Sequence, residues 1–453
     1  MALQGLTLLP NKKLALNGVR FRNIGLNYPG AIVRIYSQPS ATACEYTPGA
    51  EQDTMLDICA AAKVKVIRVK ATPFWPAQWR YGVNGGVAGV AATAGDREAH
   101  YVKIDQFLAK CEARGIGVIL NLFFRIASPA DLAGQTLRAG WLTPGSGTRN
   151  YVQSVTQEVV TRYLTRQGVY GYELSNEVNH YNDATDATRG SYPGVNSSYG
   201  TPASYSAAND IFRGLEWSQI CEWWYGLISV IDNQRIILTG NGPNSYTQYG
   251  GTPGISAPLV NWYLEQVRDN PTNCASIHFY GNIANTSSNF RGLDSILCGG
   301  HSWQKKYGRG FVLGEFGNQP WTITSISSSN GRATFTVASS CPIEAGDDFI
   351  VYGTSTAFDG GTFVVETINA GRTTITATTP ISGTFSGSVK GFQFMTESRL
   401  KRMCDDIINS DTDLAMVWMI DSDPLAPILE SINHPGNSQQ PALIRYANEK
   451  LGW

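Results

Sequence analysis

Two glutamates at the ends of two apolar segments are the residues of this chain best placed to act as a chemical pair. Glu177 lies in Tyr170-Gly-Tyr-Glu-Leu-Ser-Asn-Glu-Val-Asn179, and Glu315 lies in Phe311-Val-Leu-Gly-Glu-Phe-Gly317. Cleavage of a glycosidic bond needs one carboxyl group to protonate the leaving oxygen and a second to attack the sugar or direct water. Each Glu alone is equally well explained as a strand-end residue in water. The other polar residues at strand ends therefore decide between the two interpretations.

The elements that must position this pair are short apolar segments that alternate with helical patterns. Near-continuous Val, Ile and Leu without polar alternation indicates strands buried on both faces. Eight such segments are Val19–Asn27, Val64–Ala71, Gly117–Phe123, Val169–Ser175, Arg235–Gly240, Ala275–Tyr280, Phe311–Gly314 and Ala415–Ile420. Helical patterns between them are Thr54–Lys63, His100–Arg114, Arg149–Arg166, Ala207–Asp232, Leu259–Asn270, Gly292–Tyr307 and Thr396–Ser410. This repetition predicts an α/β protein with a (β/α)8 TIM barrel.

A doubly wound open sheet is the alternative fold. It would place a Gly-rich phosphate-binding loop directly after the first strand. The sequence there is Asn27-Tyr-Pro-Gly30, which does not have that pattern, so the barrel is favoured.

One segment interrupts the strand–helix rhythm. From Thr322 to Lys390 the chain is rich in Ser, Thr, Gly and Val, and segments such as Ala333–Val337 and Thr373–Ala377 alternate with period two. We expect a small all-β domain, residues 322–390, inserted after the seventh barrel strand, with a catalytic barrel formed by residues 1–321 and 391–453. The insertion faintly resembles modules of bacteriophage virion proteins. It is either a decoration or a part that shapes the cleft or docks to a virion or cell-surface partner.

Composition excludes several classes of function. The chain of 453 residues has 35 Lys and Arg against 36 Asp and Glu, so no basic face for nucleic acid is expected. No segment is apolar and long enough to span a membrane. The 8 Cys form no Cys-x-x-Cys pair and no metal-ligand spacing with the 5 His, so we expect neither a metal nor a cofactor. No secretory signal is visible, which leaves a cytoplasmic or virion location, or secretion if the sequence is trimmed.

Polar residues recur where the expected strands end. Because the carboxyl ends of barrel strands converge on one pocket, these side chains can meet despite their distance in sequence. Together with the two glutamates they are Arg68, Asn121, Asn176, His278, Tyr280 and Trp418.

This ordered set resembles the clan A retaining glycoside hydrolases, and most closely family 5, the cellulase and mannanase type. That family has Arg on strand two, Asn-Glu ending strand four, His-x-Tyr near strand six, Glu ending strand seven and Trp on strand eight. The resemblance covers most of the chain apart from the β insertion. One position departs from the family pattern, because Phe123 stands where those enzymes often have His.

The resemblance implies a retaining β-glycosidase that acts on a polysaccharide or oligosaccharide, with endo action favoured over exo. Glu177 would be the acid/base and Glu315 the nucleophile, which Arg68 keeps ionised and Tyr280 orients. The expected substrate-binding residues are Arg68, Asn121, Asn176, which would bond the 2-hydroxyl, His278, Tyr280 and Trp418, which would form the floor under the reacting sugar.

The sequence is also compatible with two other functions. A non-catalytic carbohydrate-binding or structural virion protein on a barrel scaffold is the main one, and a Schiff-base aldolase using Lys70 ranks low because it leaves both glutamates without roles. Trp75, Trp79, Trp141 and Trp321 fall in predicted loops and serve either as packing or as sugar platforms. Glu173, inside the fourth strand, is given no role.

Overall fold

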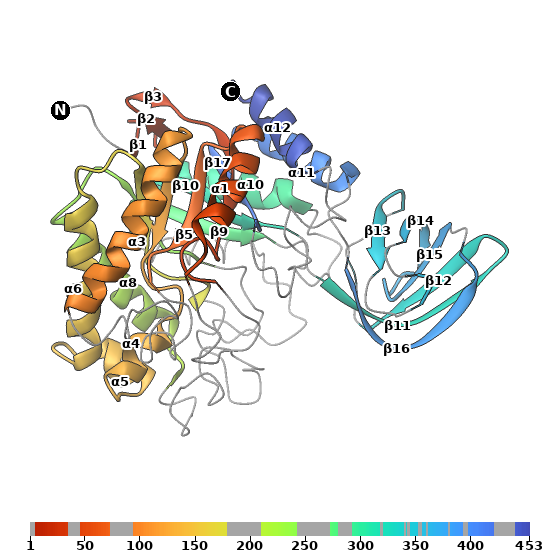
Figure 1. Cartoon of the computed structure of the whole chain (residues 1–453), viewed down its shortest axis with the longest axis horizontal. Coiled ribbons are helices and arrows are strands. Elements are labelled where there is room, and N and C mark those ends of the chain that lie inside the picture. The colour runs from red at the N-terminus through yellow and green to blue at the C-terminus, as the bar shows by residue number, and fades with distance from the viewer. Residues whose placement is uncertain are drawn as a thin grey trace.

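Eight parallel strands form the central sheet of the molecule (Figure 1). In sheet order they are β8 (Ile236–Leu238), β7 (Val169–Glu173), β6 (Gly117–Asn121), β5 (Val66–Lys70), β4 (Asn23–Asn27), β17 (Leu414–Val417), β10 (Gly310–Phe316) and β9 (Cys274–Phe279). A parallel bridge between Asn241 and Ile277 links the two edges, so the sheet is a nearly closed barrel. The predicted (β/α)8 barrel is confirmed.

The computed structural model describes most of the chain, with gaps between the described ranges. These ranges are 5–34, 46–72, 94–178, 210–241, 272–279, 292–317, 320–338, 341, 345–351, 356–358, 361–378, 381–392, 397–420 and 440–453. The predicted helix Leu259–Asn270 lies outside them. None of the described helices is both long and apolar enough to cross a membrane.

The barrel strands are buried on both faces, as their apolar composition predicts. Every residue of β4, β5, β6 and β10 is buried. The first predicted strand, Val19–Asn27, is too long, because Val19 and Arg20 are exposed and form a separate strand, β3 (Val19–Arg20).

Helices cover the outside of the barrel (Figure 1). They are α1 (Gly49–Ala61), α3 (Ala94–Ala113), α6 (Gly147–Tyr163), α8 (Gly214–Ser229), α10 (Gly292–Tyr307), α11 (Glu397–Asn409) and α12 (Gln440–Lys450), with the short α4 (Ala127–Leu132) and α5 (Leu137–Leu142) after β6. Helix α6 begins where Ser146 Oγ accepts a hydrogen bond from the backbone N–H of Arg149 at 3.0 Å. Helix α3 is followed by Gly115, whose φ of 65° suits a residue without a side chain.

An N-terminal hairpin closes the barrel at the amino ends of its strands. Strands β1 (Leu6–Leu8) and β2 (Leu14–Leu16) are antiparallel, and β3 continues the sheet. Their apolar side chains join those of the barrel strands in one buried cluster that includes Leu6, Leu14, Phe21, Val66, Ile119, Leu238 and Met416. With this end packed, the carboxyl ends of the strands are where a pocket can form.

Six antiparallel strands after β10 form a second, smaller closed barrel, which lies to one side of the large one (Figure 1). They are β11 (Pro320–Ser329), β12 (Arg332–Val337), β13 (Asp348–Val351), β14 (Thr362–Ile368), β15 (Thr374–Thr378) and β16 (Gly383–Phe392). The rings of Phe335, Phe349 and Phe363 pack in its own core, with Phe335 at 4.9 Å from each of the other two. The ends of this segment are adjacent, since Pro320 pairs with Phe392. The division of the chain into two domains stays a prediction.

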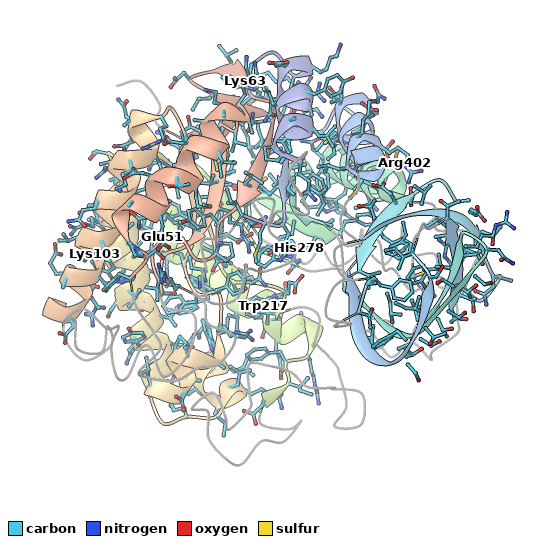
Figure 2. All side chains as sticks on the ribbon, turned by 45° about the vertical axis from the view of Figure 1, so that its right-hand side comes forward. Glu51, Lys63, Lys103, Trp217, His278 and Arg402 are labelled. Atoms are coloured by element: carbon cyan, nitrogen blue, oxygen red, sulfur yellow. The ribbon has the colours of Figure 1, made fainter. Side chains whose placement is uncertain are left out.

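Among the described residues, an ion pair links the small barrel to a helix of the large one. Arg402 on α11 lies 2.6 Å through Nη2 from Oδ1 of Asp347, whose side chain is buried. Figure 2 shows Arg402 at the side that faces the small barrel, and His278 in the interior of the large one.

Candidate active site

Arg68 lies at the centre of a hydrogen-bond network at the carboxyl ends of the strands. It comes from β5 and is 3% exposed. Its Nη1 donates to Glu315 at 2.5 Å and to Asn27 Oδ1 at 2.9 Å. Its Nη2 donates to Asn176 Oδ1 at 2.7 Å, and its Nε donates to Glu173. One guanidinium therefore orders four side chains from the ends of three other strands, β4, β7 and β10.

The charge of Arg68 is secured by its partners. Burial alone would lower the pKa of Arg68, but the carboxylates of Glu173 and Glu315 outweigh burial and raise it above its ordinary value. The guanidinium therefore remains positive, and it faces the ring of Phe124 with 5.5 Å between Cζ and the ring centre.

His278 on β9 lies between the two glutamates. Its Nδ1 is 2.9 Å from Glu177 Oε1 and 3.3 Å from Glu315 Oε2. Burial lowers the pKa of His278 to about 4, although the nearby carboxylate of Glu315 opposes this. The imidazole is therefore neutral at pH 7, and a proton on Nδ1 lets it donate to both carboxylates.

The two glutamates are close together but differ in environment. One carboxylate oxygen of Glu177, one of Glu315 and a ring nitrogen of His278 all lie within 4.8 Å of one another. The side chain of Glu315 is 2% exposed, whereas that of Glu177 is 28% exposed. Glu315 is thus held in the protein interior beside Arg68, and Glu177 faces outward.

The backbone at Glu177 is fixed by the neighbouring strand end. Glu177 has a φ of 53°, and its N–H donates to the carbonyl of Gly240 at 2.7 Å. A Cβ at Gly240 would lie 1.9 Å from the carbonyl oxygen of Ser175, so only glycine fits there. The segment after β8 therefore helps to aim Glu177.

Glu173 has no role predicted from the sequence, yet this residue is central to the network. It is fully buried on β7 and accepts hydrogen bonds from Arg68 Nε and from Asn121 Nδ2, the latter at 2.7 Å. A charged residue in an otherwise apolar parallel strand needs a buried partner, and that signal could have revealed it.

The structure brings together most of the residues proposed for the site. Those that meet in one network are Arg68, Asn121, Asn176, Glu177, His278 and Glu315. Trp418 is half-buried after β17, and its backbone N–H donates to Phe316 at the same end of the barrel. Tyr280 lies outside the described residues. The catalytic and binding roles of all these residues stay predictions.

Several aromatic residues have other places. Trp141 lies in helix α5 and not in a loop as predicted. It is fully buried, donates through Nε1 to the Ile126 carbonyl at 2.8 Å and packs on Trp224. It therefore belongs to the core and is not a sugar platform. Phe123, which stands where family 5 enzymes often have His, also packs against Trp224 in this core. Trp75 and Trp79 lie outside the described residues, and Trp321 lies in β11.

Within the described part of the chain, Glu177, His278 and Glu315 are also the one cluster spaced to hold a metal ion. A proton on His278 Nδ1, which two adjacent carboxylates favour, would leave no lone pair there for a cation. The donor set therefore fits a hydrogen-bonded carboxylate pair better than a metal centre.

Known glycoside hydrolases are similar to this chain both in sequence pattern and in fold. The family model described as cellulase, glycosyl hydrolase family 5, matches residues 30–327. The endo-1,4-β-mannanase of Rhizomucor miehei superimposes with a TM-score of 0.55 at 9% identity, over 99% of this chain and 100% of that one. The endo-1,4-β-D-mannanase of Thermotoga petrophila gives a TM-score of 0.53 at 12% identity, over 95% of this chain and 100% of that one.

At such low sequence identity, these structural similarities show the fold alone. No curated protein sequence matches the chain. The family model, however, covers more than half of the sequence, and its range contains both glutamates and the strand ends that hold them. This protein belongs to glycoside hydrolase family 5 and is a glycoside hydrolase with a carbohydrate substrate.

Proposed function

We propose that this enzyme is a retaining β-glycosidase that cleaves a poly- or oligosaccharide by double displacement, with Glu315 as nucleophile and Glu177 as acid/base. The observation that supports this most is the close approach of the two carboxylates, which have oxygens within 4.8 Å of each other. Retaining enzymes place the two groups about 5 to 5.5 Å apart, and inverting enzymes about 6.5 to 9.5 Å apart to admit a water molecule.

The two environments suit the two roles. Glu315 is buried and accepts a charge-assisted hydrogen bond from Arg68, which favours the ionised nucleophile. Glu177 is more exposed, toward the side from which substrate and water arrive, and contacts the neutral His278. An acid at that position can protonate a leaving oxygen and later deprotonate water.

The reaction then has two steps. Glu315 attacks the anomeric carbon while Glu177 gives its proton to the glycosidic oxygen, which leaves with the aglycone. In the second step Glu177 takes a proton from water, the water oxygen attacks the anomeric carbon, and the bond to Glu315 breaks. Asn176, held by Arg68, is placed to bond the sugar 2-hydroxyl, a contact that strengthens in the transition state.

The remaining assignments complete the proposal. Asn121, His278, Tyr280 and Trp418 contact the substrate, with Trp418 under the reacting sugar.

Endo action on a β-1,4-linked mannan or glucan is the first choice for assay, because solved structures with this fold include endo-mannanases. Residues 322–390 form a separate domain that contacts polymer or a virion or cell-surface partner. Neither nucleic acid nor membrane is a partner, in line with the formal net charge of −1.

The stereochemistry of the first product tests this proposal. Proton NMR of a reaction on a β-linked oligosaccharide, recorded before mutarotation, should show the β-anomer first. An α-anomer as first product would indicate an inverting enzyme and would rule out Glu315 as a covalent nucleophile.

A further inference from the structure

We propose that Glu173 is a positioning residue for hydrolysis: its carboxylate fixes Arg68 in the orientation that holds Glu315 and Asn176, and its charge keeps the surroundings of the nucleophile negative. Glu173 does not touch the reacting atoms. This inference rests on the proposed function, in which Glu315 attacks the sugar.

Both oxygens of Glu173 are occupied by side chains from other strands. Oε2 accepts from Arg68 Nε on β5 and from Asn121 Nδ2 on β6, the latter at 2.7 Å. Ser276 Oγ on β9 lies 3.5 Å from Oε1. A carboxylate held from three strands and fully buried cannot turn away without breaking these contacts.

This anchoring determines where the rest of Arg68 points. A guanidinium is a planar fork whose donors have fixed directions, so fixing Nε also fixes the two terminal nitrogens. Nη1 then meets Glu315 at 2.5 Å, and Nη2 meets Asn176 at 2.7 Å. Glu173 thus acts on the nucleophile and on the proposed 2-hydroxyl ligand through one intermediate side chain.

The charges give Glu173 a second effect. Arg68 is one positive charge between two buried carboxylates, so the group as a whole is negative. His278 is neutral above about pH 4 and adds no positive charge, because burial lowers its pKa to about 4. The transition state of glycoside cleavage carries positive charge on the sugar, which a net negative site stabilises.

A matched control lies at the opposite end of the barrel. Arg235 and Asp232 form another buried pair, 2.5 Å between Nη1 and Oδ2 with both side chains 3% exposed or less. The other hydrogen bonds of Arg235 go to backbone carbonyls of Leu164, Arg166 and Val169. Asp232→Asn therefore removes a buried ion-pair charge, as Glu173→Gln does, without touching the site.

The experiment compares Glu173→Gln, Glu173→Asp and Asp232→Asn with the wild type on an activated aryl β-glycoside. Both amide variants should melt at lower temperature than the wild type. Only Glu173→Gln should lower kcat/KM, by about tenfold or more. In the pH profile of kcat/KM for Glu173→Gln, the acidic limb should move to lower pH by on the order of 1 unit. The reason is that losing a neighbouring negative charge favours the ionised form of Glu315. Glu173→Asp, which keeps the charge, should return the limb toward its wild-type position.

Two results would overturn the inference. One is a Glu173→Gln variant that loses stability as Asp232→Asn does but keeps the wild-type pH profile, which would make Glu173 a structural anchor only. The other is an acidic limb that moves to higher pH, which would mean that the negative charge of Glu173 does not act on Glu315.

A second measurement does not depend on turnover. Carbon-13 NMR of labelled glutamate side chains, with Glu315→Gln used for assignment, follows the ionisation of Glu315 directly. Its midpoint should fall in Glu173→Gln and stay unchanged in Asp232→Asn. A wild type that cleaves no β-glycoside would refute the proposed function, while this titration would still decide whether Glu173 is coupled to Glu315; equal midpoints in wild type and Glu173→Gln would refute the coupling.

Discussion

Arg68 organises the site because one rigid guanidinium reaches four side chains from the ends of three other strands. Each of its three nitrogens has an acceptor: Glu173 at Nε, Glu315 and Asn27 at Nη1, and Asn176 at Nη2. The two catalytic candidates differ in burial and in partners, and this difference is what permits one carboxyl group to stay ionised while the other exchanges a proton.

The nucleophile assignment predicts a large and specific loss. Glu315→Gln keeps the shape of the side chain but cannot attack, so kcat should fall by about 10³-fold or more while the protein stays folded. Glu158→Gln, which changes a glutamate paired with Arg97 outside the site, should leave kcat near the wild-type value. Both are measured by steady-state kinetics alongside melting curves. Normal activity in Glu315→Gln would contradict the assignment.

The acid/base assignment predicts a dependence on the leaving group. Glu177→Ala should slow substrates with poor leaving groups far more than activated aryl glycosides, which need little protonation. Added azide should restore turnover of the activated substrate and yield a β-glycosyl azide, detectable by NMR. An equal loss on both substrate types without rescue would show that Glu177 does not transfer the proton.

Buried histidines predict a loss of stability in acid. Burial lowers the pKa values of His100 and His278 from 6.5 to about 4. Below about pH 6.5 these histidines are protonated in the unfolded chain, whereas in the folded chain they are protonated only near pH 4. The free energy of unfolding therefore falls as pH decreases between these two values. His100 lies on α3, and its Nε2 lies 3.0 Å from the Ala71 carbonyl oxygen, outside the catalytic pair. Melting temperatures measured from pH 7.5 to pH 4.5 should fall less steeply in His100→Gln than in the wild type; identical slopes would exclude this origin.

At the scale of elements, the barrel strands can be predicted from the sequence because both of their faces are buried. Continuous apolar segments marked all eight, and residues at their carboxyl ends supplied Arg68, Asn176 and Glu315. The sequence does not predict which polar residues inside the barrel contact one another. The sequence shows Glu173 only as a charged residue inside a strand, and the pairing of β5, β6 and β7 places it beside Arg68 and Asn121.

Other elements were missed for physical reasons. Helices α4 and α5 have 6 residues each, too short for a helical period to be recognised. The sequence therefore predicts Trp141 in a loop, although it lies in α5 and packs in the core. The hairpin of β1 and β2 has strands of 3 residues, whose burial depends on a barrel end that the sequence does not display.

The small barrel has a core that can be tested separately. Phe335 is fully buried between Phe349 and Phe363, so Phe335→Ala should cost about 3 to 5 kcal/mol of small-barrel stability. Calorimetry should show an early transition, while hydrolysis of an aryl glycoside stays near normal. Val364→Ala, at a position 47% exposed on β14, is the control and should change little. Loss of activity in step with the early transition would show that the small barrel supports the active site.

At the scale of the whole molecule, the chain leaves the large barrel and returns to it at neighbouring points. Thr322 pairs with Lys390 across β11 and β16, so a short linker can span the junction. Replacing residues 322–390 with a Gly/Ser linker should leave a folded enzyme that cleaves an aryl glycoside, because Glu177 and Glu315 lie on the large barrel.

The same deletion tests what the small barrel does. Activity on long polymers, or attachment to a partner, should fall relative to the full chain, measured by reducing-sugar release and by pull-down on insoluble polysaccharide. An unfolded deletion variant would show that the small barrel is part of one core, to which Arg402 and Asp347 already contribute a contact. Unchanged polymer activity and binding would show that it is a decoration.

Covalent trapping tests the central claim most directly. A 2-deoxy-2-fluoro-β-glycoside with an activated leaving group slows the second step, so a retaining enzyme accumulates its glycosyl intermediate. After proteolysis, mass spectrometry should find the fluorosugar on the peptide that contains Glu315, and Glu177→Ala should still form this adduct from the activated reagent. A label on Glu173 or on another residue, or no label while the reagent is hydrolysed with inversion, would contradict the account.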